Sequence, residues 1–154
     1  PSYYGFSMRS NHFIALDTNE GATGPTGGIS PPQLAWLRGE LAGLWPAAPV
    51  IILTHHPPFP ADSYRLADFP DFFAAVAGYH GSRTAGGRVV AIISGHRHFR
   101  ETHVVDGIRF EVVGPLSFGL QDMTEVGYTL VEGPADDPRF TWQTLGPSPP
   151  APDC

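Results

Sequence analysis

The stretch Arg88-Val89-Val90-Ala91-Ile92-Ile93-Ser94-Gly95-His96-Arg97-His98 decides the fold. An unbroken, largely β-branched run of this length is typical of a strand buried on both faces, as in a parallel sheet covered by helices. Gly95 removes the Cβ where the chain leaves the sheet. Ligands bind outside the carboxyl ends of strands in open α/β sheets, so His96 and His98 are expected at a site. In extended backbone, these side chains at positions i and i+2 would point the same way.

A second stretch repeats this arrangement. The apolar run 50–53 is followed by Thr54-His55-His56-Pro57-Pro58. Taken alone, any of these histidines is more simply a surface residue or a hydrogen-bonded core residue. Two buried strands that both end in histidine are different, because neutral imidazole is the commonest protein metal ligand. We therefore expect the two histidine clusters to converge on a metal site.

The composition sets broad limits on fold and partners. A chain of 154 residues with 42% hydrophobic and 16% charged residues fits one compact domain with a sizeable core. The net charge is −6, lysine is absent, and the nine arginines are scattered, which argues against a nucleic-acid or anionic-membrane surface. No apolar run approaches the length of a membrane helix, and from the opening residues we expect no signal peptide. The single cysteine, Cys154, excludes an internal disulfide, so the compartment stays undetermined. Because Pro1 stands where an initiator Met would, we expect a processed or partial product.

The remaining elements predict a layered α/β core. Ser30-Pro31-Pro32-Gln33 has the serine cap, first-turn proline and third-position Gln of a helix start. Leucines recur at helical spacing after it, and a second apolar helical stripe follows over 68–79. Strands are expected over 3–8 and 12–17 as a hairpin, over 101–106 and 108–113 around the turn Asp106-Gly107, and over 127–132 and 139–145. Helices between buried strands imply crossovers and a mixed sheet, while 147–154 is a Pro-rich tail or linker.

The two histidine segments and their surroundings resemble a known family. Thr54-His55-His56-Pro57-Pro58 followed by Gly95-His96-Arg97-His98 is similar to the last two signature blocks of the calcineurin-like metallophosphoesterases. The segments 12–18 and 33–37 and the Asp106-Gly107-Ile108 turn also look like segments of that family. The match runs from about Tyr3 to about Leu145, so residues 1–146 would be the carboxyl-terminal portion of such a domain.

The resemblance implies a fold, a cofactor and site residues. The family has a layered αββα sandwich, of which this chain would be a partial version: a mixed sheet with two helices and C-terminal hairpins. Two divalent ions, such as Mn, Fe or Zn, activate a water that attacks a phosphomonoester or phosphodiester substrate. By position, His55 and His96 match ligands of the second metal and His98 matches a ligand of the first. His56 would be substrate-facing or would support a ligand from behind.

Half of the expected site is missing from the sequence. The family's Asp-x-His, Gly-Asp and Gly-Asn-His blocks do not occur in the chain. Without their bridging carboxylate, three imidazoles are expected to hold at most one ion. The isolated chain is therefore expected to be catalytically incomplete.

Three functions remain open. The chain is the carboxyl-terminal part of a phosphoesterase completed by a longer chain or a partner, a one-metal or metal-free binding module, or a plain α/β domain. A half-domain should expose a sheet edge and part of an apolar layer, which invites self-association. The residues that the missing half would cover are expected to be Tyr3, Tyr4, Phe6, Phe72 and Phe73.

Overall fold

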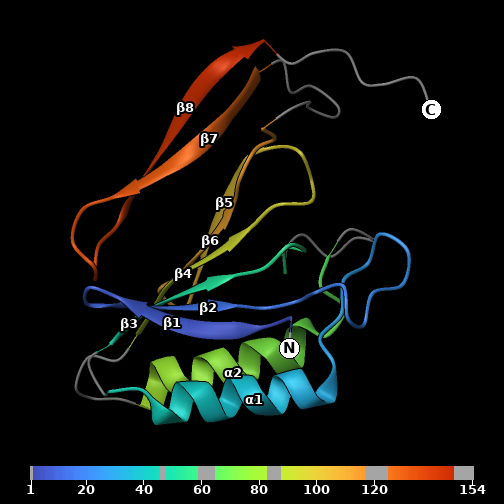
Figure 1. The fold of residues 1–154 in the computed structure, drawn as a ribbon, viewed down its shortest axis with the longest axis vertical. Helices are drawn as coiled ribbons and strands as arrows, with labels where there is room; N and C mark the ends of the chain where they lie inside the picture. Colours follow the sequence, from blue (N-terminus) through green and yellow to red (C-terminus); the bar gives the residue numbers. More distant parts are fainter. Residues whose placement is uncertain (1, 46–47, 59–64, 83–87, 117–124, 148–154) are drawn as a thin grey trace.

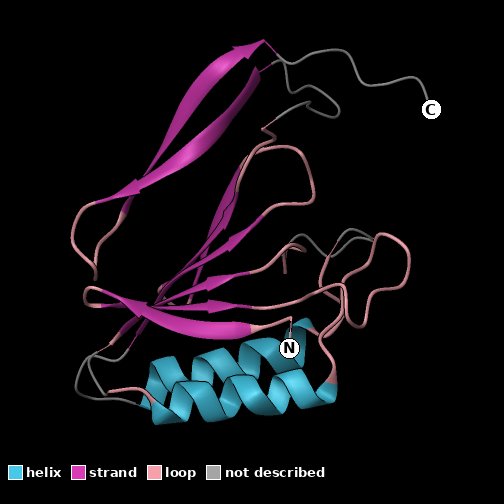
Figure 2. Ribbon diagram, viewed as in Figure 1, coloured by secondary structure: helices cyan, strands magenta, loops and turns pink. Residues whose placement is uncertain are grey.

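The computed structural model describes residues 2–45, 48–58, 65–82, 88–116 and 125–147. A six-stranded mixed sheet carries two helices on one face, and a separate two-stranded hairpin stands over the other (Figures 1 and 2). The elements follow in the order β1 (Tyr4–Met8), β2 (Asn11–Ala15), α1 (Pro31–Gly43), β3 (Pro49–Leu53), α2 (Phe69–Ser82), β4 (Arg88–Ser94), β5 (Glu101–Val105), β6 (Ile108–Val112), β7 (Glu125–Glu132) and β8 (Arg139–Pro147). The mixed α/β class predicted from the sequence is confirmed.

The centre of the sheet is parallel and its edges are antiparallel. The strand order is β1-β2-β3-β4-β6-β5, in which β2, β3, β4 and β6 run parallel. The two histidine-ending runs form the adjacent strands β3 and β4, as predicted. Val50 pairs with Val89 and Ile51 with Ala91, so β4 carries one extra residue. This bulge turns both Val89 and Ile92 toward the helices, where both are fully buried.

The helices bury one face of the sheet, which we call the covered face. Helix α1 begins after Ser30, whose hydroxyl accepts a hydrogen bond from the Gln33 backbone N–H at 3.4 Å. From α2, Phe72 and Val76 are fully buried against the sheet. The expectation that Phe72 lies on a surface left for a missing half is wrong, because its spacing on α2 directs it into the core.

Gln33 does not complete a capping box. Its side chain is fully buried and turns away from the helix start toward the end of β2. There its Oε1 accepts from the Asp17 backbone N–H at 2.8 Å and its Nε2 donates to the Asp17 carbonyl at 2.9 Å. A buried amide must satisfy its donors and acceptors, and an unpaired loop backbone offers both. Gln33 therefore ties α1 to the loop that leads to the functional site.

The described residues cover the opposite side of the sheet, which we call the open face, only in part. The β7–β8 hairpin crosses above it (Figure 1) and is anchored by Trp142. The Trp142 indole packs where a Cβ on Gly114 or on Gly127 would lie 2.7 Å from its ring, and the Arg100 guanidinium lies 4.8 Å from its ring centroid. Between hairpin and sheet lie cavities of about 670 and 340 Å³. Phe13, Ile51 and Ile93 form the apolar floor of the larger cavity, and Ile93 also lines the smaller one.

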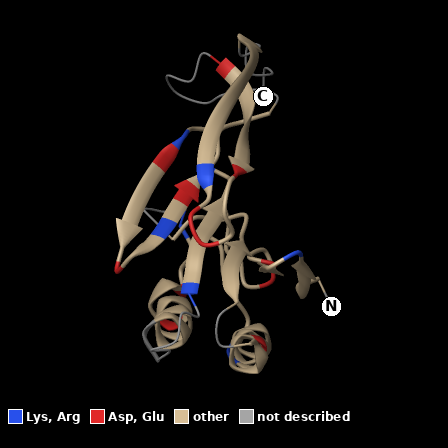
Figure 3. Ribbon diagram, turned by 90° about the vertical axis from the view of Figure 1, so that its left-hand side faces the viewer, with Lys and Arg blue, Asp and Glu red and all other residues tan. Residues whose placement is uncertain are grey.

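Charged residues are spread over the described chain. Figure 3 shows acidic and basic positions interspersed along strands and helices, as the scattered arginines of the sequence indicate. Within the described ranges, neither helix has the length and apolarity needed to cross a bilayer. The last strand reaches Pro147, and the rest of the proline-rich segment, 148–154, lies outside the described residues.

Candidate metal centre

The ends of β3 and β4 are fastened to each other beyond the last strand residues. The Thr54 backbone N–H donates to the Ile93 carbonyl at 3.0 Å, and the Thr54 and Ser94 hydroxyls share a hydrogen bond of 2.8 Å. One step further on, the Gly95 backbone N–H donates to the His55 carbonyl at 3.1 Å. These bonds continue the register of the parallel pair into the loops, so the histidines that follow emerge side by side.

Three histidines meet at this point. His55, His56 and His96 each offer one ring nitrogen, and these nitrogens lie within 4.8 Å of one another. His55 Nε2 and His96 Nδ1 are 3.1 Å apart. The His56 and His96 ring centroids are 4.3 Å apart. The sequence-based expectation that the two clusters converge agrees with this geometry for His55 and His96.

The far sides of the His56 and His96 rings are held by the loop between β2 and α1. His96 Nε2 donates to the Pro25 carbonyl at 2.9 Å, because a carbonyl can only accept. His56 Nδ1 lies 2.9 Å from the Thr18 hydroxyl, which also accepts the His56 backbone N–H at 3.1 Å. Metal-ligating histidines commonly donate their second ring N–H to such an oxygen. This arrangement directs His96 Nδ1 and His56 Nε2 toward the shared space.

The loop packs closely against the buried ring. Thr18 is fully buried, and a Cβ on Gly27 would collide with the His56 ring. Only a glycine therefore lets this loop pass over His56 at its present distance. The loop is fixed in turn by backbone hydrogen bonds of Gly27 to Arg65 and of Gly28 to Thr18.

Burial and crowding lower the pKa of two of the three clustered histidines. Desolvation, followed by the neighbouring His96 and His55 rings, lowers the pKa of His56 to about 4. Desolvation, then His96 and His98, lowers the pKa of His55, which is more exposed. Both shifts favour the unprotonated imidazole near pH 7, and unprotonated imidazole is the form that binds metal.

The donor set fits one transition-metal ion. Zn–N bonds of about 2.0–2.1 Å in a tetrahedral site separate neighbouring nitrogens by roughly 3.3 Å. The 3.1 Å between His55 Nε2 and His96 Nδ1 is close to that spacing. Three imidazoles that leave a further position open match the ligand count of catalytic zinc sites. The three-residue group contains no carboxylate among the described residues.

His98 lies near this group without being a member of it. It is close enough to lower the pKa of His55 by charge repulsion, yet it is not among the three clustered residues. The expectation of extended backbone from His96 to His98 is wrong, since both residues have positive φ, 68° and 55°. Non-glycine residues in this left-handed region cost of order 1–3 kcal/mol each and concentrate at functional sites. The ligand role of His98 stays a prediction.

Sequence reasoning missed the residues that hold the rings. Thr18 and Pro25 act through a hydroxyl and a backbone carbonyl, and no motif marks either group. The glycines of the loop 19–29 match no phosphate-binding motif, yet Gly27 serves a close approach to His56. The one available signal was that a buried histidine such as His56 needs a polar partner.

Comparisons with known proteins give a partial likeness. No protein-family model matches the chain. A curated protein of Rhodococcus erythropolis strain PR4, named probable cyclic nucleotide phosphodiesterase, is 35% identical over 112 residues, which are 66% of this chain and 32% of that protein. The chain therefore spans about a third of the length of the curated relative it matches.

Two solved structures are also similar. GAP50, the anchor in the inner membrane complex of Plasmodium, has a TM-score of 0.55 at 14% identity, covering 84% of this chain and 44% of its own. This likeness concerns the fold alone. A conserved protein of Streptococcus pneumoniae TIGR4, described as a predicted phosphoesterase, is 14% identical over 87% of this chain and 88% of its own, but its TM-score of 0.36 is too low to support an argument. The curated relative supports a relationship to proteins of phosphoesterase type.

Proposed function

We propose that this chain carries the histidine part of a metal-dependent phosphoesterase of the calcineurin-like type. The reaction would be hydrolysis of a phosphomonoester or phosphodiester by a metal-activated water. The observation that carries the proposal is the meeting of His55, His56 and His96 at the carboxyl ends of two adjacent parallel strands. The named phosphodiesterase relative supports the same reaction class.

The chain's own residues would act as ligands and as their supports. His55, His56 and His96 would hold one divalent ion, Mn, Fe or Zn, with His98 available to a second ion in the complete site. Bound there, the metal would supply Lewis acidity and a water of lowered pKa. Thr18 and the Pro25 carbonyl would fix the His56 and His96 tautomers, so that the ligating nitrogens are set before binding. His56 would therefore be a ligand rather than a residue that supports one from behind.

The open face would be where the rest of the domain packs. Residues 1–146 would form the carboxyl-terminal portion of a layered αββα sandwich, whose remaining layer packs on this face. Phe13, Ile51 and Ile93 line its cavities, while Tyr4 and Phe6 on β1 are 56% and 42% exposed. The missing half, with the bridging carboxylate, would come from a longer chain, a partner or a second copy through the exposed sheet edge.

A second candidate function is a binding module that holds one ion or none. The all-imidazole composition of the cluster favours it, because two cations at close range need an anionic bridge to offset their repulsion. Such a module would bind a partner or regulate it without turnover.

Metal binding and activity separate the two candidates. Zn²⁺ and Mn²⁺ would be titrated by calorimetry into the chain, into His55→Ala and into His103→Ala, a matched histidine substitution on β5. We expect binding of one ion, weakened about 10-fold or more by His55→Ala and unchanged by His103→Ala. An aryl phosphate diester with Mn²⁺ is then assayed with the chain and with a form extended at its amino terminus. Turnover by the extended form supports the enzyme, and metal binding without turnover in both forms supports the module.

A further inference from the structure

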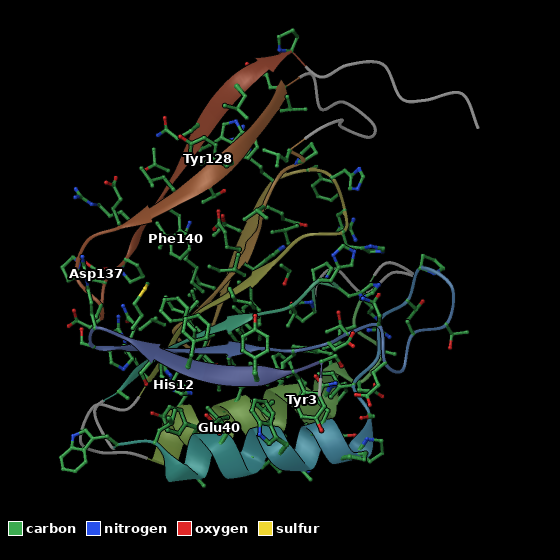
Figure 4. All side chains as sticks on the ribbon, in the orientation of Figure 1. Tyr3, His12, Glu40, Tyr128, Asp137 and Phe140 are labelled. Carbon is green, nitrogen blue, oxygen red and sulfur yellow. The ribbon has the colours of Figure 1, made fainter. Side chains whose placement is uncertain are left out.

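A second constellation of reactive side chains lies away from the histidine cluster. Ser7 on β1, His12 on β2 and Glu40 on α1 form one continuous hydrogen-bonded chain. Ser7 Oγ lies 3.0 Å from His12 Nδ1, and His12 Nε2 lies 2.9 Å from Glu40 Oε1. Figure 4 shows His12 and Glu40 facing each other between the sheet and the first helix.

The fold places these groups by register. Ser7 and His12 are directly paired across the β1–β2 hairpin, so both side chains point to the helix side of the sheet. Glu40 reaches them from α1 with a side chain that is 29% exposed, against 9% for His12. Gly5, two residues before Ser7, makes the arrangement possible, since a Cβ there would lie 2.9 Å from His12 Nε2 and would collide with Glu40.

The partners fix the proton positions. An ionised carboxylate only accepts, so His12 Nε2 carries the proton that is donated to Glu40. In the neutral ring Nδ1 then holds a lone pair, and the Ser7 hydroxyl must donate to it. A hydroxyl within 2.6–3.2 Å of a base that a third group orients is the arrangement of an activated nucleophile. Ser7 is also exposed on an edge strand, within reach of a soluble substrate.

We propose that Ser7 is a nucleophile toward small carboxylic esters, with His12 as its general base and Glu40 as the positioning residue. Ser7 Oγ would form a bond to the carbonyl carbon as its proton passes to His12 Nδ1. The ester C–O bond then breaks, and the leaving alkoxide takes that proton and departs as the alcohol. Water, deprotonated by the same nitrogen, cleaves the acyl-serine to the carboxylic acid and restores Ser7.

This activity is separate from the proposed phosphoesterase. His12 lies at the start of β2, whereas the histidine cluster follows the end of β3, which runs parallel to β2. The two groups therefore lie at opposite ends of the sheet. The alternative is a purely structural role, in which the three residues tie the hairpin to α1. That role leaves the Ser7 hydroxyl no more reactive than any exposed serine.

Labelling with a fluorophosphonate tests the difference, since this reagent modifies activated serines. The full chain would be treated in the presence of EDTA, so that a bound metal makes no contribution, and the modified residue mapped by mass spectrometry. Ser10, exposed in the adjacent turn, is the internal reference. We expect Ser7 to react about 100-fold faster than Ser10, and Ser7→Ala to abolish both this labelling and any hydrolysis of p-nitrophenyl acetate.

Variants of the other two residues complete the test. Glu40→Gln should slow labelling of Ser7 by about 10-fold while the chain stays folded by circular dichroism. Glu20→Gln, an acidic residue outside the trio, should leave the rate unchanged. Labelling of Ser7 at the rate of Ser10 in the folded chain would overturn the proposal, as would a rate insensitive to Glu40→Gln.

Discussion

The apolar side chains on the covered and open faces of the six-stranded sheet are packed to different degrees. On the covered face, Ile14, Val50, Ile52 and Ile92 are fully buried beneath the helices. On the open face, Phe13, Ile51 and Ile93 line cavities of about 670 and 340 Å³ under a single hairpin. The difference shows that this chain completes the apolar layer on the covered face, whereas the apolar layer on the open face still contains space for further side chains.

The histidine cluster resembles the covered face, because its central side chain is buried and held by contacts. His56 is 2% exposed and is held by Thr18, Gly27 and its neighbouring histidines. The Thr18 hydroxyl and the Pro25 carbonyl, both in the loop between β2 and α1, hold the His56 and His96 rings. A site with preset ligands can therefore exist beside an incompletely covered sheet, because strand ends and loops, rather than the open face, position its side chains.

The largest expected effect tests the contrast between the faces directly. Phe72→Ala should lower the free energy of unfolding by about 3–5 kcal/mol, because it leaves a cavity in a fully buried site. Phe13→Ala, the matched change on the open face, should cost less than about 2 kcal/mol, because its ring already borders a cavity. Urea unfolding of both variants measures the difference. Equal losses would show that the open face is packed as tightly as the covered one.

The next effect concerns the buried cluster. His56 has a pKa of about 4 in the folded chain and an ordinary value of 6.5, so the unfolded chain binds more protons between these limits. The contribution of neutral His56 to the free energy of unfolding is therefore fully present above pH 6.5 and is lost as the pH drops toward 4. The total loss is about 3 kcal/mol, at about 1.4 kcal/mol per pKa unit. Urea unfolding in EDTA across this range measures the loss. His56→Gln should flatten the dependence, while His103→Gln, on the edge strand β5, should not.

A smaller effect tests how the hairpin is anchored. Gly127→Ala should cost about 1–3 kcal/mol, because its Cβ would collide with the Gln143 carbonyl and lie 2.7 Å from the Trp142 ring. Gly146→Ala in the same hairpin is the control, since nothing lies within 4 Å of its Cβ position. Near-ultraviolet circular dichroism should also change for Gly127→Ala, through Trp142. An unchanged spectrum and stability would mean that the hairpin is not held by this contact.

The smallest expected effect concerns the amino-terminal cap of helix α1, which packs on the covered face. Ser30→Ala should destabilise by about 0.5–1 kcal/mol, through loss of the capping bond to the Gln33 backbone N–H, which is long at 3.4 Å. Ser10→Ala, in the exposed Arg9-Ser10 turn, should change little. Thermal unfolding compares the two. A loss well above 2 kcal/mol for Ser30→Ala would show that its bond to Glu20, 2.8 Å long, contributes more than the cap.

The sequence by itself determined the elements and two of the three clustered histidines. Apolar runs gave β3 and β4, helical leucine spacing gave α1, and Asp106-Gly107 gave the β5–β6 turn with φ values of 51° and 78°. These features are local or periodic, so they can be predicted from the sequence alone. Adjacency of parallel strands then brought His55 and His96 together.

Only the tertiary structure decided which residues complete the site and which face stays open. Thr18, Pro25 and Gly27 reach the histidines from a loop 29 to 71 residues away in sequence, as the separations of Gly27 from His56 and of Pro25 from His96 show. The left-handed backbone at His96 and His98 and the Ser7–His12–Glu40 chain were equally invisible beforehand. The physical reason is that these contacts depend on distances between segments, which residue type and periodicity do not encode.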